Sequence, residues 1–120
     1  MDGSRVCLDT SALIAFLRGQ EPGASAVDRA LFGVARARKE IGEEALLGCM
    51  TVLPFDEAAA RRAADVHAHL IRQNQDIGVK DVLISAVCLE HASPLLTLNE
   101  RHFARVPGLS VVAPAQLLAR

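Results

Sequence analysis

Short apolar runs alternate along the sequence with longer segments of helical periodicity. The apolar runs are bounded by polar or turn-forming residues and predict β-strands at residues 5–8, 50–55, 94–98 and 109–112. The longer segments predict helices at residues 12–17, 27–40, 43–47, 57–73, 80–91 and 114–119. Because strands and helices alternate, the pattern is typical of an α/β sandwich with a mostly parallel sheet of about four strands.

Turn-forming and capping residues mark where several of these elements begin and end. Residues 19–25 contain Gly, Pro and Ser and predict a loop, and so do residues 74–78. Asp56 is placed to cap the helix that follows it. The helix at residues 80–91 is apolar nearly all round, which predicts that it is buried. No repeat or linker divides the sequence, so we expect one domain over residues 1–120.

The amino-acid composition limits how such a domain can bind other molecules. Of the 120 residues, 51% are hydrophobic and 3% are aromatic, so we expect a core of Ala, Leu, Val and Ile. The scarcity of aromatic residues excludes base-stacking platforms for nucleic acid. Thirteen Lys and Arg residues against 14 Asp and Glu residues give a net charge of −1, which excludes a broad polybasic surface. Any nucleic acid is therefore expected to bind at a local site.

The three cysteines, Cys7, Cys49 and Cys88, lie far apart in apolar runs and form no zinc-binding pair. We expect small buried side chains with reduced thiols, which are typical of a cytoplasmic protein. The N-terminal residues lack the apolar centre of a signal peptide, and no apolar stretch approaches the ~20 residues that cross a bilayer. The sequence thus predicts a cytoplasmic protein that does not enter a membrane.

Three polar residues stand where apolar elements begin or end. Asp9 ends the first strand, Asp81 begins the apolar helix, and Asn99 follows the strand at residues 94–98. A carboxylate at the end of a buried strand is costly unless it binds a cation or caps a helix. Structural alternatives are open for all three: Asp9 and Asp81 are both placed to be N-caps, and Asn99 suits a plain β-turn.

Taken together, these three residues favour a cation site. In parallel α/β sheets, ligands bind beyond the carboxyl ends of the strands, and Asp9 and Asn99 both lie there. Carboxylate and amide oxygens that converge at one point suit hard divalent cations such as Mg²⁺, which retains several waters. A cation held in this way can activate water and stabilise an in-line displacement at phosphorus.

The order of these motifs carries a family resemblance. Asp-Thr-Ser at residues 9–11 follows a strand, and Val-Leu-Pro-Phe-Asp-Glu-Ala-Ala occupies residues 52–59. Further along stand Asp-Val-Leu-Ile-Ser-Ala at residues 81–86, Leu-Thr-Leu-Asn-Glu-Arg-His-Phe at 96–103 and Val-Pro-Gly-Leu at 106–109. In this order and spacing, the sequence closely resembles the PIN domain, and within it the VapC-type toxins of toxin–antitoxin pairs. The resemblance covers almost the whole chain and is weakest between residues 18 and 30.

The resemblance implies a three-layer sandwich and an Mg²⁺- or Mn²⁺-dependent endoribonuclease. It also implies a small antitoxin as partner and a homodimer. Carried over position by position, Asp9 is the first metal-binding acid, Asp81 the third, and Asn99 fills the fourth place. Ser11 and Thr97 would support the site by hydrogen bonding.

The family's second acid has no direct match in this sequence. In relatives it is a Glu four residues before a Gly; here the matching Gly is Gly33, and Arg29 stands four residues before it. The segment after Arg18 is also shorter than in the family. Asp28 is the nearest acid, and it binds the metal, caps the helix that follows, or does both. Since a hard cation depends on the number of charged oxygens, losing one carboxylate would weaken metal binding.

Two other functions stay open. A PIN-like domain without catalysis would keep the fold and act as a binding or assembly module, which the missing second acid favours. A phosphotransferase with Asp9 as nucleophile, of the haloacid-dehalogenase type, needs a second Asp two residues later. Ser11 stands at that position, so this function ranks last.

The remaining polar residues have weaker interpretations. The basic cluster at residues 36–39 either contacts RNA or an antitoxin or is a solvated helix face, which we favour. His67 and His69 are two residues apart on a predicted helix and do not face each other, so they form a poor metal pair. His102 is expected at the edge of the site, in packing or hydrogen bonding, and not as a general base.

Overall fold

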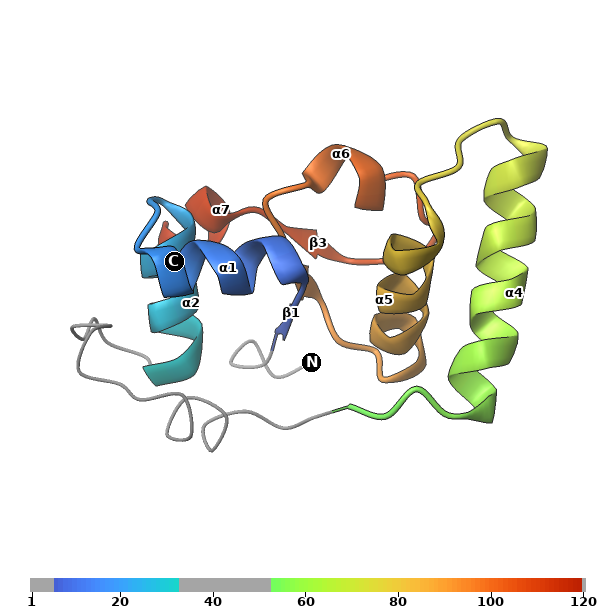
Figure 1. Cartoon of the computed structure of the whole chain (residues 1–120), viewed down its shortest axis with the longest axis horizontal. Helices are drawn as coiled ribbons and strands as arrows, with labels where there is room; N and C mark the ends of the chain where they lie inside the picture. The colour runs from blue at the N-terminus through green and yellow to red at the C-terminus, as the bar shows by residue number, and fades with distance from the viewer. Residues whose placement is uncertain (1–5, 33–52, 120) are drawn as a thin grey trace.

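The computed structural model describes residues 6–32 and 53–119, with side chains for residues 6–27 and 53–119 (Figure 1). Strands and helices alternate as the sequence predicts. In chain order the elements are β1 (Cys7–Leu8), α1 (Thr10–Arg18), α2 (Gly23–Phe32), α4 (Glu57–Arg72), α5 (Val79–Glu90), β2 (Leu95–Leu96), α6 (Glu100–Phe103), β3 (Val111–Val112) and α7 (Pro114–Leu118).

The three described strands form a parallel sheet in the order β1-β2-β3. Its register places Cys7 beside Leu95 and Leu95 beside Val111, and the next row follows one residue later in each strand. Because neighbouring residues of a strand point to opposite faces, these two rows enter two different cores. The predicted α/β fold with a parallel sheet is therefore confirmed.

Helices cover both faces of this sheet (Figure 1). One face packs against α1, α2 and α7 in a cluster of Ala12, Phe16, Ala26, Val27, Leu96, Val112 and Leu117. The other face packs against α5 and α6 in a cluster of Cys88, Leu95 and Phe103, with Cys7 and Val111 beside it. This arrangement is the three-layer sandwich that the resemblance implies.

The outermost helix, α4, packs on α5 and not on the sheet (Figure 1). Its buried residues Ala59, Ala63, Val66 and Leu70 recur at helical spacing and make one apolar face. Asp56 begins the helix as its N-cap, accepting a hydrogen bond from Ala59 N at 2.9 Å. The predicted cap and extent of this helix are confirmed.

The predicted strand at residues 50–55 is wrong in the part that the structure describes, since residues 53–56 form no strand. Pro54 has no N–H to donate to a neighbouring strand, and Phe55 is 48% exposed. Its residues 50–52 lie outside the described part of the chain. Within the described ranges the sheet has three strands instead of about four.

The predicted loop at residues 19–25 is wrong at its end, because α2 begins at Gly23. Pro22 just precedes the helix, where a missing N–H leaves no bond unmade. Glu21 accepts hydrogen bonds from Ser25 N at 3.1 Å and Ser25 Oγ at 2.8 Å, which holds the first turn. The helix predicted at residues 27–40 is described only as far as Phe32, and residues 43–47 lie outside the described ranges.

The side chains of α5 differ in exposure along the helix. Val82, Ser85, Ala86 and Cys88 are buried, as predicted for this apolar helix, but Leu83 is 39% exposed. The expectation that this helix is buried is therefore wrong near its start, where Lys80 and Leu83 are exposed. Among the described helices, none has both the length and the apolar character needed to span a membrane.

Candidate active site

Asp9 ends β1 and is the N-cap of α1, so one local sequence signal fixes its backbone. Its side chain is 5% exposed and accepts three hydrogen bonds. Oδ1 accepts from Ala12 N at 2.9 Å and from Ser11 Oγ at 2.7 Å, and Oδ2 accepts from Thr97 Oγ1 at 2.6 Å. These donors offset the cost of burying a carboxylate. The predicted capping role of Asp9 is confirmed, and it is compatible with a second role.

Thr97 connects the end of β2 to the start of α1. Its buried hydroxyl donates to Asp9 and accepts from Asn99 N at 2.9 Å. Ser11 donates to Asp9 and accepts from Leu98 N at 3.1 Å, which ties the same two segments together a second time. The predicted supporting residues Ser11 and Thr97 therefore both contact Asp9.

Asp81 is in the first turn of α5, but it does not cap the helix. The N-cap is Gly78, with a φ of 91°, and no side chain caps that end. The N-capping alternative for Asp81 is thus wrong. Its carboxylate is 14% exposed, and Oδ2 lies 3.3 Å from His102 Nδ1. Asp81 is held near the sheet edge without a local structural task for its charge.

Asn99 and His102 complete a chain of contacts that leads from Asp9 to Asp81. Asn99 Nδ2 lies 2.9 Å from His102 Nδ1, and the N-cap position of Asn99 on α6 carries no side-chain cap bond. The plain-turn alternative for Asn99 is wrong, since a one-turn helix follows it. The hydrogen bonding expected of His102 is found in its contact with Asn99, whereas its contact with Asp81 was not predicted. The i, i+3 spacing of Asn99 and His102 was the available signal for their own contact.

Asp28 is the sixth residue of α2, which begins at Gly23. It is therefore not the N-cap of a following helix, and that alternative is wrong. Its side chain lies outside the described ones, so its role as a metal ligand stays a prediction. The matching position Gly33 and the basic cluster at residues 36–39 also lie outside the described residues.

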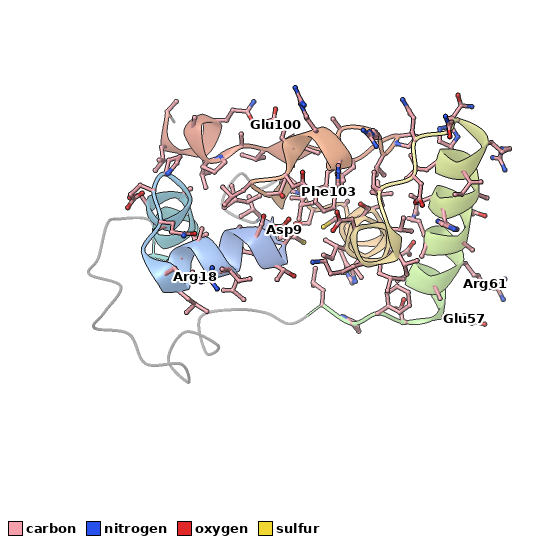
Figure 2. All side chains as sticks on the ribbon, turned by 45° about the horizontal axis from the view of Figure 1, so that its top comes forward. Asp9, Arg18, Glu57, Arg61, Glu100 and Phe103 are labelled. Carbon is pink, nitrogen blue, oxygen red and sulfur yellow. The ribbon has the colours of Figure 1, made fainter. Side chains whose placement is uncertain are left out.

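The donor set at this edge fits a hard divalent cation. Figure 2 shows Asp9 at the end of α1 that faces α5 and α6. Among the described residues, no group of three or more His, Cys, Asp and Glu side chains is arranged to hold a metal. Mg²⁺, however, is commonly bound through one or two carboxylates, with waters and substrate phosphates as its other ligands. Two carboxylates and one amide, Asp9, Asp81 and Asn99, match that requirement.

Two cysteines meet beneath the site. The pKa of Cys7 is lowered to about 6, chiefly because it is hydrogen-bonded with Cys88, whereas burial opposes the shift and Ser93 and His91 support it. The same hydrogen bond and burial raise the pKa of Cys88. Cys88 is buried, as predicted, whereas Cys7 is only partly buried, and both are free thiols. Cys49 lies outside the described residues.

This contact predicts how fast Cys7 reacts. In a Cys49→Ala background, we expect the rate of Cys7 alkylation by iodoacetamide to rise around pH 6. Adding Cys88→Ala removes the partner that stabilises the thiolate, so the midpoint should move up towards the ordinary pKa of 9.0. Mass spectrometry across a pH series measures both midpoints. An unchanged midpoint in the second variant would contradict the assigned hydrogen bond.

Fold and site together define a parallel α/β protein with acidic and amide oxygens at the carboxyl edge of its sheet. The PIN domain family model matches residues 30–109, which is most of the chain. The chain belongs to the PIN-domain family.

Curated relatives extend this match beyond the family model. Ribonuclease VapC of Rickettsia bellii is 32% identical over 124 residues, covering 88% of this chain and 92% of the relative. The tRNA(fMet)-specific endonuclease VapC of Salmonella typhimurium is 26% identical over 111 residues, covering 92% and 76%. The resemblance to VapC-type members of the family is confirmed.

A solved structure has the same fold. A chain in the crystal structure of VapBC2 from Rickettsia felis, bound to a DNA fragment from its promoter, superposes with a TM-score of 0.66. The match covers 90% of this chain and 97% of that one, at 18% identity. At this identity the likeness supports the fold alone.

Proposed function

We propose that this protein is a divalent-metal-dependent endoribonuclease, acting as the toxin of a toxin–antitoxin pair. One observation carries the proposal: the chain of contacts through Thr97, Asn99 and His102 that brings Asp9 and Asp81 to the same edge of the sheet. Relatives named as VapC ribonucleases match most of this sequence, which supports RNA as the substrate.

In this proposal Asp9, Asp81 and Asn99 hold Mg²⁺ or Mn²⁺, with Asp28 as a further ligand. The bound cation supplies a water of lowered pKa and offsets the charge that develops on the phosphate. Ser11 and Thr97 fix the orientation of the Asp9 carboxylate through its two oxygens. The reaction is hydrolysis: the oxygen of water bonds to phosphorus, and the bond to one ribose oxygen breaks.

A small antitoxin and a second copy of the chain are the proposed partners. Four large apolar side chains stay at least one-third exposed on α1 and α5, namely Ile14, Leu17, Val79 and Leu83. Exposed apolar side chains of this size are available for contact with another protein. The VapBC2 assembly of the structural neighbour adds support for an antitoxin.

The second candidate is a PIN-like binding or assembly module with weakened catalysis. It is favoured by Arg29, which stands where relatives carry an acid, and by Asp9, whose oxygens already accept three hydrogen bonds. Calorimetric titration with Mn²⁺ separates the two candidates. Binding favours the nuclease, and no binding at millimolar concentrations favours the module.

Metal removal tests the nuclease directly. We expect the purified protein to cleave RNA in Mg²⁺, to stop in excess EDTA and to resume when Mn²⁺ is added in excess. The reason is that the site's own carboxylates are negative, so only a bound cation supplies the positive charge that stabilises the transition state. A panel of RNAs that includes tRNA is the first choice, since the Salmonella relative is named for a tRNA. Gel analysis of end-labelled RNA gives the rates. Cleavage that survives EDTA would contradict metal dependence.

A further inference from the structure

His102 lies where two of the proposed cation ligands meet. Its Nδ1 is 2.9 Å from Asn99 Nδ2 and 3.3 Å from Asp81 Oδ2. One ring nitrogen either accepts a hydrogen bond or donates one, but does not do both. The shorter contact is to an amide nitrogen, which can only donate. We therefore assign Nδ1 as the acceptor from Asn99 and place the ring proton on Nε2.

This assignment decides which end of the Asn99 amide is available. An asparagine side chain carries a donor nitrogen and an acceptor oxygen on opposite sides of one carbon. Because His102 takes the nitrogen, Oδ1 is turned away from the ring. Within the described part of the chain, no hydrogen bond to Asn99 Oδ1 is formed. The amide thus offers an unshared oxygen, which is the end that a hard cation uses.

The same assignment leaves the Asp81 carboxylate without a hydrogen-bond donor among the described residues. When Nδ1 accepts from Asn99, it does not donate to Asp81 Oδ2, and no other described residue donates to that carboxylate. A carboxylate only 14% exposed then faces a ring nitrogen that carries a lone pair. A positive charge between Asp81 and Asn99 would satisfy both oxygens at once.

The packing of α6 fixes the position of His102, so that its ring can orient the Asn99 amide. It precedes Phe103, which is fully buried in the cluster with Cys88 and Leu95, so the single turn of α6 is anchored to the sheet. Figure 2 labels Phe103 on α6, the helix that packs against α5. The ring itself is 42% exposed, which leaves Nε2–H able to reach water.

We propose that His102 is a positioning residue for the cation site, an inference that rests on the proposed function. By accepting from Asn99 Nδ2, it selects the amide orientation that presents Oδ1 to a divalent cation beside Asp81. His102 touches neither the cation nor the RNA. Its effect passes entirely through Asn99.

Three substitutions separate this role from simple packing. His102→Leu keeps much of the volume and removes the acceptor. His102→Asn places a carbonyl oxygen close to the position of Nδ1 and restores the acceptor. Glu100→Gln is the control, because Glu100 is exposed on the same turn and makes no contact in the chain from Asp9 to Asp81.

The first readout is the side-chain amide of Asn99 in the metal-free protein, followed by ¹⁵N NMR and assigned by its loss in Asn99→Ser. We expect a hydrogen-bonded, slowly exchanging amide in the wild type, in His102→Asn and in the control. In His102→Leu the signal should move to the position of a solvated amide. An identical Asn99 signal in His102→Leu would overturn the proposal whatever the activity.

The second readout is Mn²⁺ affinity by calorimetry, with RNA cleavage beside it. We expect His102→Leu to lose about 10–100-fold in affinity and His102→Asn to recover most of it. A wild type that neither binds Mn²⁺ nor cleaves RNA overturns the proposed function and this inference with it. An active wild type with an equally tight His102→Leu variant overturns this inference alone.

Discussion

Asp9→Asn is expected to lower the RNA cleavage rate by roughly 100-fold or more, the upper end of what loss of one metal-site group costs. The substitution removes a full negative charge from a buried oxygen cluster, and an amide offers one acceptor oxygen where the carboxylate offers two. Initial rates in Mg²⁺ and Mn²⁺ measure the loss. Unchanged cleavage would contradict the assignment of Asp9 as a ligand.

The same substitution should also cost stability, for a separate reason. Asn can still accept from Ala12 N, so the start of α1 survives. Its Nδ2, however, would face Thr97 Oγ1, which donates to Asp9 Oδ2 at 2.6 Å in the wild type. An unmade hydrogen bond of this kind costs about 1–3 kcal/mol, which chemical denaturation can resolve.

Asp56→Asn is the matched control. Asp56 is also an N-cap, accepting from Ala59 N at 2.9 Å, but it is exposed at the start of α4. The chemical change and the cap are the same in both variants. We expect full cleavage activity and little change in the free energy of unfolding, since Asn caps helices about as well as Asp.

Asp81→Asn is expected to give a comparable loss of cleavage with almost no loss of stability. Asp81 caps nothing, and its described carboxylate contact is to His102. A negative charge in the first turn of a helix contributes only about 0.3–1 kcal/mol. A catalytic rate reduced by roughly 100-fold or more in a protein of near wild-type stability would mark Asp81 as a functional residue.

Glu57→Gln controls for the helix end. Glu57 is also in the first turn of its helix and loses the same charge, and its ion pair with Arg61 is exposed and therefore contributes little to stability. Both variants should show equally small shifts in denaturation midpoint, whereas only Asp81→Asn should lose cleavage. Retained cleavage in Asp81→Asn would exclude Asp81 as a ligand and favour the binding-module function.

Asp9→Asn and Asp81→Asn therefore distinguish a carboxylate that also stabilises the fold from one that does not. In the proposed function Asp9 serves both fold and site, since its carboxylate caps α1, is bonded to Thr97 and would also bind the cation. Asp81 caps nothing, so in the same proposal its charge serves only the site. The N-cap predicted for Asp9 is therefore found in the structure, whereas the N-cap considered for Asp81 is not.

Local signals in the sequence determined a large part of this protein. The caps Asp9 and Asp56, the apolar face of α4 and the polar residues at strand ends are all fixed by residues within one or two turns. The order of motifs along the chain indicated the PIN family and predicted that Asp9, Asp81 and Asn99 share one site. These predictions need no knowledge of distant contacts.

Only the tertiary structure decided how these residues meet. The bond from Thr97 to Asp9 joins residues 88 positions apart, and the contact of His102 with Asp81 spans 21. The sequence at residues 53–55 predicts a strand, but no strand forms there and Phe55 is exposed. A strand forms only where a neighbouring strand supplies its hydrogen bonds. Such pairing depends on register across the sheet, which no local stretch of sequence encodes.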